Sequence, residues 1–442
     1  MTTQVQVQPR GLTPAQAAEL AERTRYRVIG GVLIALGLAG YYLFARGVDP
    51  ALISTFGMNT SGVPVERQLP SWVIPSYATV TALSAVSIFL GGYQLARGFA
   101  RWTNAILGAA ILLFIFSFLT WATRDQSINL AGMLNNALLR AVPLTLGALS
   151  GVLSERAGVV NIAIEGMMLS AAMMGSLVGS LALQSFPVDQ YGTLNLWIGL
   201  SAAVATGALL ALVHGILSIR YKVDQIISGV VINIFSVGMT SFIQSKFLEP
   251  FGELNSPGIF KTWPIPVLSD IPFFGGIVFR SNLFTYAMYV LLVVVHVALF
   301  YTAWGLRTRA VGEHPKAADT LGINVFRTRY VAVLLSGMVA GLAGGYFTLG
   351  SVGRFDEVMT AGRGFISLAA MIFGKWTPFG AFGASLIFGF ADSLQGRLAI
   401  LRVPIPSQFL LMAPYLATMI ALAGLVGRAV PPAADGQPYE KQ

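Results

Sequence analysis

The chain has 442 residues, of which 55% are hydrophobic and only 11% are charged. Soluble domains carry about 25% charged residues, so this chain lacks the polar surface that a soluble fold of its length requires. Its mean hydropathy is +0.70. The composition therefore excludes a soluble enzyme, a disordered protein and a coiled coil, and it predicts a polytopic membrane protein.

The charge balance is basic, with 28 Lys and Arg against 19 Asp and Glu and a net charge of +9. Because the cations lie between apolar segments, we expect them to set the topology and to contact membrane lipid, and we expect no nucleic-acid partner. The chain has no cysteine and 3 histidines, so we expect no disulfide, no metal site and no cofactor. The N-terminus lacks the order of a signal peptide, and the first apolar segment is expected to stay in the protein.

Apolar segments follow one another along most of the chain. Since about 20 apolar residues span a bilayer as a helix, they predict an all-α, polytopic transmembrane helical bundle of about eleven spanning helices. The segment Gly364–Phe373 is too short to span alone, and it either crosses with its neighbours or re-enters. The predicted spans are Val28–Phe44, Trp72–Leu95, Thr103–Ala122, Ala137–Leu153, Val159–Leu183, Leu196–Ser218, Gln225–Ser245, Leu283–Ala303, Tyr330–Thr348, Phe379–Gln395 and Gln408–Leu425.

Loop charges orient this bundle. The stretch Gly305–Arg329 and the N-terminal tail are rich in Arg and Lys, so both are expected in the cytoplasm, and Lys246–Asn282 is then an external loop. Thr13–Arg27 reads as a short amphipathic helix, capped by Thr13 and begun by Pro14, on the membrane surface. The tail 428–442 is also expected to be cytoplasmic.

The sequence contains no catalytic signature. Phe373-Gly-Lys-Trp376 lacks the spacing and the Ser or Thr of a phosphate-binding loop. The zinc-protease motif H-E-x-x-H and the hydrolase motif G-x-S-x-G are absent. We therefore predict that the chain is not an enzyme and has no catalytic residue.

Polar side chains inside the apolar segments are the candidates for function. Asn161 and Glu165 are four residues apart, which predicts that they share a helix face, and Asn233 lies in the middle of another span. Ionisable groups at this depth are costly and usually face an interior cavity. Two interpretations stay open for these residues: a polar substrate pathway, or hydrogen bonds that hold helices together. For His214 and His296 we favour packing or an interhelical hydrogen bond.

The loop Gly305–Arg329 contains a short predicted helix. Pro315 can begin it and Gly322 can end it. Such a helix would present Ala317, Ala318 and Leu321, a small and modestly apolar surface that suits docking into a groove of another protein. The alternative is a loop that only sets topology.

Several segments resemble a known family. GLRTRAVGEHPKAADTLGINV (Gly305–Val325) resembles the cytoplasmic loop of ABC importer permeases of the branch that serves nucleosides, simple sugars and branched-chain amino acids. Three further segments resemble the nucleoside and simple-sugar subgroup of these permeases. They are LSERAGVVNIAIEGMML (Leu153–Leu169), VDQIISGVVIN (Val223–Asn233) and GRGFISLAAMIFGKWTPFGAFGASLIFGFADSLQ (Gly362–Gln395). The resemblance covers residues 129–427, the expected permease core. Residues 28–125, with three additional apolar segments, depart from the pattern, and residues 1–27 form the amphipathic N-terminal segment.

The resemblance implies a membrane-spanning subunit of an ATP-driven importer in the bacterial inner membrane, with a nucleoside or another small polar solute as cargo. It implies three partners: a cytoplasmic ATP-binding subunit with two cassettes, a second permease subunit and an extracytoplasmic substrate-binding lipoprotein. By the same resemblance, the loop 305–329 would couple ATP hydrolysis to alternating access of the cavity. Its expected coupling residues are Arg309, Glu313, Pro315, Ala317, Ala318, Asp319 and Gly322.

Two other functions are compatible with the composition. An ion-coupled secondary transporter would use Glu165, Asp224 or Asp392 as its coupling carboxylate. A structural membrane protein would transport nothing.

Overall fold

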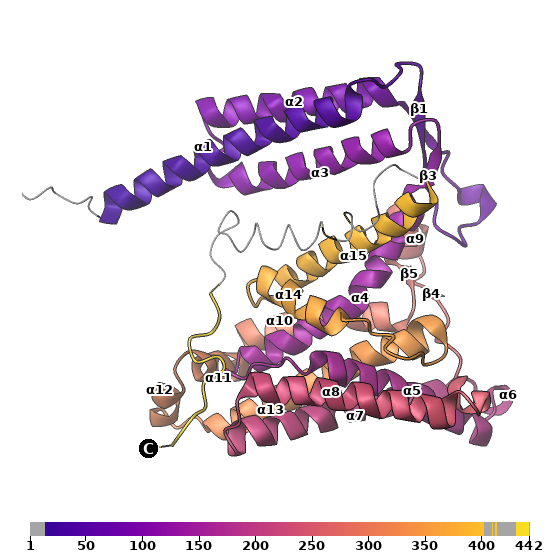
Figure 1. Ribbon diagram of the computed structural model, residues 1–442, viewed down its shortest axis with the longest axis vertical. Helices are drawn as coiled ribbons and strands as arrows, with labels where there is room; N and C mark the ends of the chain where they lie inside the picture. Colours follow the sequence, from indigo (N-terminus) through magenta and orange to yellow (C-terminus); the bar gives the residue numbers. More distant parts are fainter. Residues whose placement is uncertain (1–13, 402–408, 410–411, 413–429, 442) are drawn as a thin grey trace, which may run out of the picture. The chain divides into compact units, whose positions relative to one another are not determined.

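The computed structural model describes residues 14–401, 409, 412 and 430–441. The chain forms two compact units (Figure 1). The first contains Met1–Met58, Gln68–Leu130 and Leu398–Pro404, and the second contains Asn59–Arg67, Ala131–Arg397 and Ile405–Gln442. The short segment Asn59–Arg67 therefore comes from the N-terminal part of the chain but packs in the second unit.

The first unit is a bundle of three helices with a small sheet. Helices α1 (Pro14–Gly40), α2 (Ser76–Ala96) and α3 (Thr103–Ala122) lie side by side in Figure 1. The sheet has the order β2-β1-β3, with β1 (Ile53–Gly57) antiparallel to β2 (Trp72–Pro75) and parallel to β3 (Ser127–Asn129). The predicted amphipathic segment is not a separate helix, because α1 continues unbroken into the apolar stretch Glu22–Ala45. Its predicted cap, Thr13, lies outside the described residues.

The second unit contains the remaining helices. In chain order they are α4 (Leu130–Glu155), α5 (Ile164–Ser185), α6 (Val188–Tyr191), α7 (Leu194–Gly215), α8 (Gln225–Ile243), α9 (Phe274–Val278), α10 (Leu283–Tyr301), α11 (Ala303–Glu313), α12 (Pro315–Thr320), α13 (Val325–Gly345), α14 (Arg363–Phe373) and α15 (Pro378–Ile400). Strand β4 (Trp263–Pro264) pairs with β5 (Arg280–Ser281). Wider π-helical turns extend α1, α7, α8 and α13 through Tyr41–Ala45, Ile216–Arg220, Gln244–Leu248 and η8 (Tyr346–Val352). The 3-10 turns are Val65–Arg67, Ala100–Trp102, η6 (Gly252–Asn255) and Leu268–Asp270.

Long apolar helices dominate both units, which confirms the all-α polytopic membrane bundle. Among the described residues, 9 helices are long and apolar enough to span a membrane. They are Glu22–Ala45, Ser76–Ala96, Ala100–Ala122, Leu130–Glu155, Ile164–Ser185, Leu194–Arg220, Gln225–Leu248, Leu283–Tyr301 and Val325–Val352. Helix α15 supplies the predicted segment Phe379–Gln395, whereas most of the last predicted span, Gln408–Leu425, falls outside the described residues.

Glycines let α5, α7 and α13 pack closely against one another in the second unit, as Figure 1 shows. A Cβ atom at Gly207 of α7 would lie 2.2 Å from the carbonyl oxygen of Gly337 in α13. A Cβ at Gly199 would lie 2.6 Å from the carbonyl oxygen of Gly175 in α5. Backbones this close allow van der Waals packing, which drives helix association where no hydrophobic effect operates between helices.

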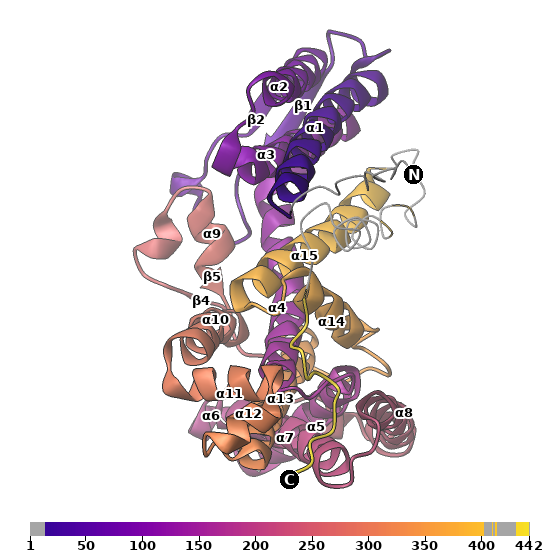
Figure 2. The same ribbon diagram turned by 90° about the vertical axis from the view of Figure 1, so that its left-hand side faces the viewer.

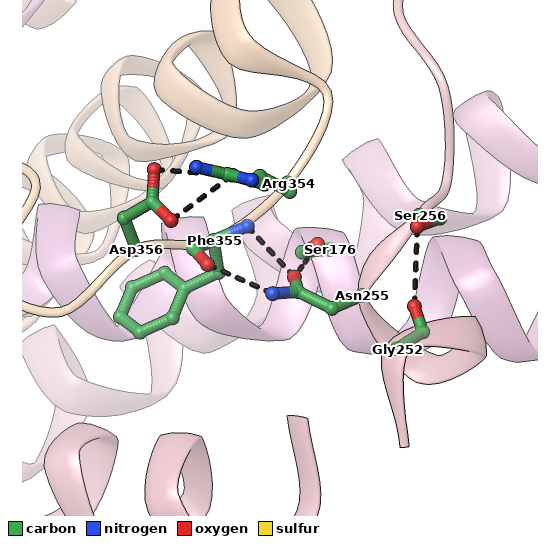
Figure 3. Close-up of polar contacts among 7 residues, drawn as sticks. All are labelled: Ser176, Gly252, Asn255, Ser256, Arg354, Phe355 and Asp356. Carbon is green, nitrogen blue, oxygen red and sulfur yellow. Dashed lines mark hydrogen bonds and ion pairs between the residues drawn. The ribbon is translucent and has the colours of Figure 1, made fainter. Parts of the chain in front are cut away.

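The chain between α13 and α15 runs from one end of the second unit to the other. Phe355 lies at the start of this segment and pairs with Asn255 of η6. The Asn255 side chain accepts a hydrogen bond from the Phe355 amide (2.7 Å) and donates one to the Phe355 carbonyl (2.8 Å), as Figure 3 shows. The Asn255 oxygen also accepts from Ser176 (2.7 Å). At its end, the Trp376 indole donates to Glu155, the last residue of α4 (2.5 Å). The segment Gly364–Phe373 is therefore the helical part of this connection, and the residues before it are irregular.

The two ends of α10 allow the topology to be tested. Its first residue follows the loop that is predicted to be external, and its last precedes the loop that is predicted to be cytoplasmic. Its 19 residues at 1.5 Å each separate the two by about 28 Å. The chain has no native cysteine. A cysteine at the exposed Lys316 should resist an impermeant maleimide in intact cells and react after the membrane is opened. The matched variant at exposed Glu253 should react in intact cells, and the opposite labelling pattern would invert the topology.

Candidate functional site

Helix α5 begins later than the sequence predicts. Residues 156–163 form turns and irregular backbone, so Asn161 lies before the helix, and the prediction that it shares a helix face with Glu165 is wrong. Gly158 adopts a φ of +81°, which favours glycine. Gln225 accepts a hydrogen bond from the Val160 amide (2.7 Å), which satisfies a backbone group that the helix would otherwise pair.

Asn233 of α8 holds the first turn of α5 in place. Its oxygen accepts a hydrogen bond from the Gly166 amide (2.8 Å), and its nitrogen donates to the Ile162 carbonyl (2.9 Å). A Cβ at Gly166 would lie 2.9 Å from the Asn233 oxygen, so the clamp depends on glycine at that position. The Asn233 side chain thus replaces two backbone partners at a helix start, where amide groups lack intrahelical acceptors.

Glu165 caps a different helix across the bundle. One carboxylate oxygen accepts hydrogen bonds from the Thr360 hydroxyl (2.6 Å) and the Gly362 amide (2.9 Å). The other accepts from the Gly364 amide (2.6 Å). Gly362 is the N-cap residue of α14, but it has no side chain that could accept a hydrogen bond from the first helical amides. A negative charge at a helix N-terminus is favourable because of the helix dipole, so Glu165 stabilises the break at which α14 begins.

Asn161 completes this buried group, which we call the break cluster: Asn161, Glu165 and Asn233. The Asn161 nitrogen donates to the Ser336 hydroxyl of α13 (3.0 Å), and Ser336 in turn contacts Ser150 of α4 (2.9 Å). The Asn161 oxygen has no hydrogen-bond partner among the described residues. The three residues are 0%, 6% and 7% exposed. The structure therefore brings all three together, with Glu165 and Asn233 fully engaged in protein contacts.

His214, Asp224 and Asp392 have polar partners in the structure, whereas His296 packs against the rings of Phe300, Tyr301 and Phe379. His214 contacts the Ser228 hydroxyl (3.0 Å) and the Val160 carbonyl (2.9 Å), which is an interhelical link of the predicted kind. Asp224 accepts from the amides of Ile226 and Ile227 at the start of α8. Asp392 forms an ion pair with Arg140. Two of the carboxylates that an ion-coupled carrier would use are thus occupied: Asp224 caps a helix and Asp392 forms an ion pair.

The short helix predicted in the Arg-rich loop is present as α12. Pro315 is its first residue, His314 caps it by accepting from the Ala317 amide (3.1 Å), and Gly322 follows it with a φ of +82°. The prediction that Ala318 faces outward is wrong, because its side chain is only 2% exposed. Ala317 is exposed, and Leu321 is 82% exposed. The outward surface of α12 is therefore Ala317 and Leu321.

The C-terminal tail explains why Ala318 is buried. Tyr439 packs with Ala318, Val311 and Val325, and its ring lies 5.5 Å from that of Phe326. The sequence does not predict that the Ala318 side of α12 is buried. The tail that covers it has no regular secondary structure, so no periodic pattern of apolar residues indicates that it packs there.

Hydrogen bonds and one ion pair secure the tail. The Ala434 amide donates to the Gly312 carbonyl (2.9 Å), and Glu313 accepts from the Ala433 amide (3.1 Å). Lys222 pairs with Glu440 (2.5 Å). Burial raises the pKa of Asp435 to about 6. The predicted coupling residue Glu313 is thus a contact of the tail, Asp319 lies near Tyr439, and Arg309 lies over the Phe300 ring at 5.0 Å.

A groove of about 550 Å³ lies where α12 turns into α13. Leu321 and Trp304 supply its apolar surface, and Arg307 and Arg327 supply positive charge. None of the described residues that line this groove carries a carboxylate. Together with the outward face of α12, this groove offers a partner an apolar contact beside two cations.

Comparison with known proteins decides the family. Residues 133–427 match the family described as the permease component of branched-chain amino acid transport systems. The chain belongs to this permease family. It is therefore a component of a membrane transport system and not an enzyme, and its apolar helices make it a multi-pass membrane protein.

Several known permease proteins are similar in sequence to this permease. It is 44% identical to the guanosine ABC transporter permease protein NupQ of Bacillus subtilis over 69% of this chain and 95% of that protein. It is 39% identical to the nucleoside ABC transporter permease protein NupC of Lactococcus lactis, over 69% of this chain and 96% of that protein. The glucose ABC transporter permease protein TsgB13 of Haloferax volcanii is 28% identical over 73% of this chain and 82% of that protein. No solved structure matches the permease significantly.

Proposed function

We propose that this permease moves nucleosides, or related simple-sugar solutes, as the membrane subunit of an ATP-driven importer. The observation that carries the proposal is the 44% identity to a guanosine permease over 95% of that protein's length. A nucleoside permease of a second organism is similar over nearly its whole length as well. The family and these relatives favour an importer subunit over an ion-coupled carrier or a structural protein.

Three partners complete the importer in this proposal: a cytoplasmic ATP-binding subunit with two cassettes, a second permease subunit and a substrate-binding lipoprotein outside. The bacterial inner membrane is the proposed location. The groove beside α12 supports a contact with the ATP-binding subunit, because an exposed leucine flanked by Arg307 and Arg327 suits a partner with an apolar pocket and an acidic rim. In this proposal Ala317 touches the ATP-binding subunit. The other predicted coupling residues shape α12 and hold it in place: Arg309, Glu313, Pro315, Ala318, Asp319 and Gly322.

The break cluster is the proposed support of the substrate pathway. Transporters commonly place solute sites where helices are interrupted inside the bundle, and two such interruptions, before α5 and before α14, meet at Glu165. Because Glu165 and Asn233 are engaged with protein, we assign them to fixing the two breaks. Asn161 keeps one unpaired oxygen that a polar solute can engage when the bundle opens.

We propose that the additional N-terminal part, residues 1–125, is a module of its own, apart from Asn59–Arg67, which packs in the second unit. The family match begins at residue 133, and the relatives that are matched over nearly their full length cover 69% of this chain. We assign residues 129–427 to the transport core and 428–442 to a cytoplasmic tail that fixes α12.

The test is transport by the complete importer, purified with its partners and placed in liposomes. We expect ATP-dependent uptake of labelled guanosine that other nucleosides inhibit and that leucine does not. A non-hydrolysable ATP analogue should reduce uptake to background, and this serves as the control for the energy source. Competition by leucine would move the substrate class to amino acids. Uptake that continues without ATP and collapses with a protonophore would refute the importer.

A further inference from the structure

A second polar cavity, of about 730 Å³, lies at the end of the second unit opposite α12. The segment Asn59–Arg67 and the loop between α8 and α10 form most of its wall. The pairing of β4 with β5 closes this loop, and Figure 2 shows both strands beside α9. A volume of this size is typical of small-molecule sites. We call it the outer pocket.

Positive charge is in excess in the outer pocket. Lys261 and Arg280 line it, and none of the described residues that line it is an Asp or a Glu. Within the part of the chain that the structure describes, neither cation forms an ion pair. Arg280 donates one hydrogen bond to the Gly62 carbonyl, but its Nε is buried without a partner. Two cations without a counter-charge favour an anion in this cavity.

Two hydroxyl groups in the same wall also lack partners in the described structure. They are Thr60 Oγ1 and Ser281 Oγ, on side chains that are 9% and 2% exposed. A buried polar group left unpaired costs about 1–3 kcal/mol, so each requires an explanation such as a bound molecule. Water could satisfy the hydroxyls, but it cannot balance the excess of two positive charges.

The walls of the outer pocket are held rigidly. Asn282 donates to the Gly350 carbonyl (2.6 Å), and Asn135 donates to the Ile277 carbonyl (3.0 Å). Arg67 pairs with Asp270 (2.5 Å), which fixes the N-terminal segment against the loop. Unpaired donors held in fixed positions are characteristic of a preorganised binding site.

We propose that the outer pocket binds a phosphate group carried on a small hydroxyl-bearing moiety, with Lys261 and Arg280 on the phosphate and Thr60 and Ser281 on the hydroxyls. This site contains no residue of the break cluster and lies about the length of α10 from α12. Thr60 precedes the family match at residue 133, so one wall belongs to the additional N-terminal part of this chain. A soluble sugar phosphate and the headgroup of phosphatidylglycerol both carry this chemistry.

The test uses the full-length permease in nanodiscs of zwitterionic lipid, with ribose 5-phosphate as the soluble probe. We expect saturable binding by calorimetry that is at least tenfold tighter than the binding of ribose. The variants Lys261→Gln and Thr60→Val should each weaken binding at least threefold, and Lys261→Gln with Arg280→Gln at least tenfold. The matched control Arg354→Gln changes a cation that is paired with Asp356 outside the pocket and should bind normally. Lys261→Gln keeps the test valid if Arg280→Gln fails to fold.

A second arm distinguishes the two sources of phosphate. If phosphatidylglycerol is the occupant, nanodiscs that contain it should raise the melting temperature of the permease and suppress ribose 5-phosphate binding, and both effects should disappear in Lys261→Gln. The proposal is overturned if neither probe binds, or if binding is the same in the Lys261 and Thr60 variants as in the unaltered protein. Guanosine uptake is measured separately, so failure here leaves the proposed transport function untouched.

Discussion

Replacing Glu165 with alanine is expected to destabilise the folded permease and to abolish uptake. The change removes the acceptor of three hydrogen bonds, from the Thr360 hydroxyl and from the amides of Gly362 and Gly364. At about 0.6 kcal/mol for each hydrogen bond inside a membrane protein, the loss is about 2 kcal/mol, or roughly 30-fold in the folding equilibrium. The N-terminus of α14 also loses its negative cap. The measurement is thermal unfolding in detergent together with uptake by the reconstituted importer.

Two further variants make this prediction specific. Glu165→Gln keeps one acceptor oxygen but places an amide donor near the Gly364 amide, so we expect an intermediate loss of stability. The matched control Glu253→Ala removes an exposed carboxylate from η6 and should unfold like the unaltered protein. If Glu165→Ala unfolds normally while the KM for guanosine rises, Glu165 contacts the solute and its capping role is refuted.

Placing charges on the outward face of α12 should separate the permease from its ATP-binding subunit. Leu321 is 82% exposed in the permease alone, and burying a leucine contributes about 1.5–3 kcal/mol to an interface. The double variant Ala317→Glu/Leu321→Asp loses the free energy gained by burying Leu321 in the interface. Burying the two new charges adds a further cost. We expect affinity for the ATP-binding subunit to fall by about 100-fold and ATP-dependent uptake to fall to background. Co-purification and uptake are the measurements.

The folded bundle should survive this change because both side chains are exposed. Val65→Asp is the matched control: Val65 is 78% exposed, belongs to the segment that lines the outer pocket, and should retain the ATP-binding subunit. Ala318→Glu serves as a second comparison, since it disrupts the packing with Tyr439 and should destabilise the protein itself. Normal co-purification of the Ala317 and Leu321 variant, with normal uptake, would show that α12 is not the coupling contact.

Features set by neighbouring residues could be predicted from the sequence. Apolar length alone identifies the spanning helices, because a buried backbone in lipid must satisfy its hydrogen bonds within the helix. Local chemistry also fixes the start of α8, where Asp224 accepts from the next amides, and both ends of α12, where Pro315 begins the helix and Gly322 follows it. These signals act over a few residues, so the order of residues is sufficient to predict them.

Features that depend on distant partners could not be predicted in this way. Asn161 has the spacing of a helical residue, but Gln225 and Asn233 bind the backbone around it from another helix and so delay the start of α5. Ala318 has the position of an outward residue, but Tyr439, more than 100 residues later, covers it. Thr60 and Arg280 line the same cavity although the α2 and α3 helices of the first unit lie between them in the chain. The sequence by itself determined a membrane bundle with a short helix between two of its long helices. Only the tertiary structure decided which polar groups are paired, because hydrogen-bond partners in a bundle come from elements that sequence spacing does not relate.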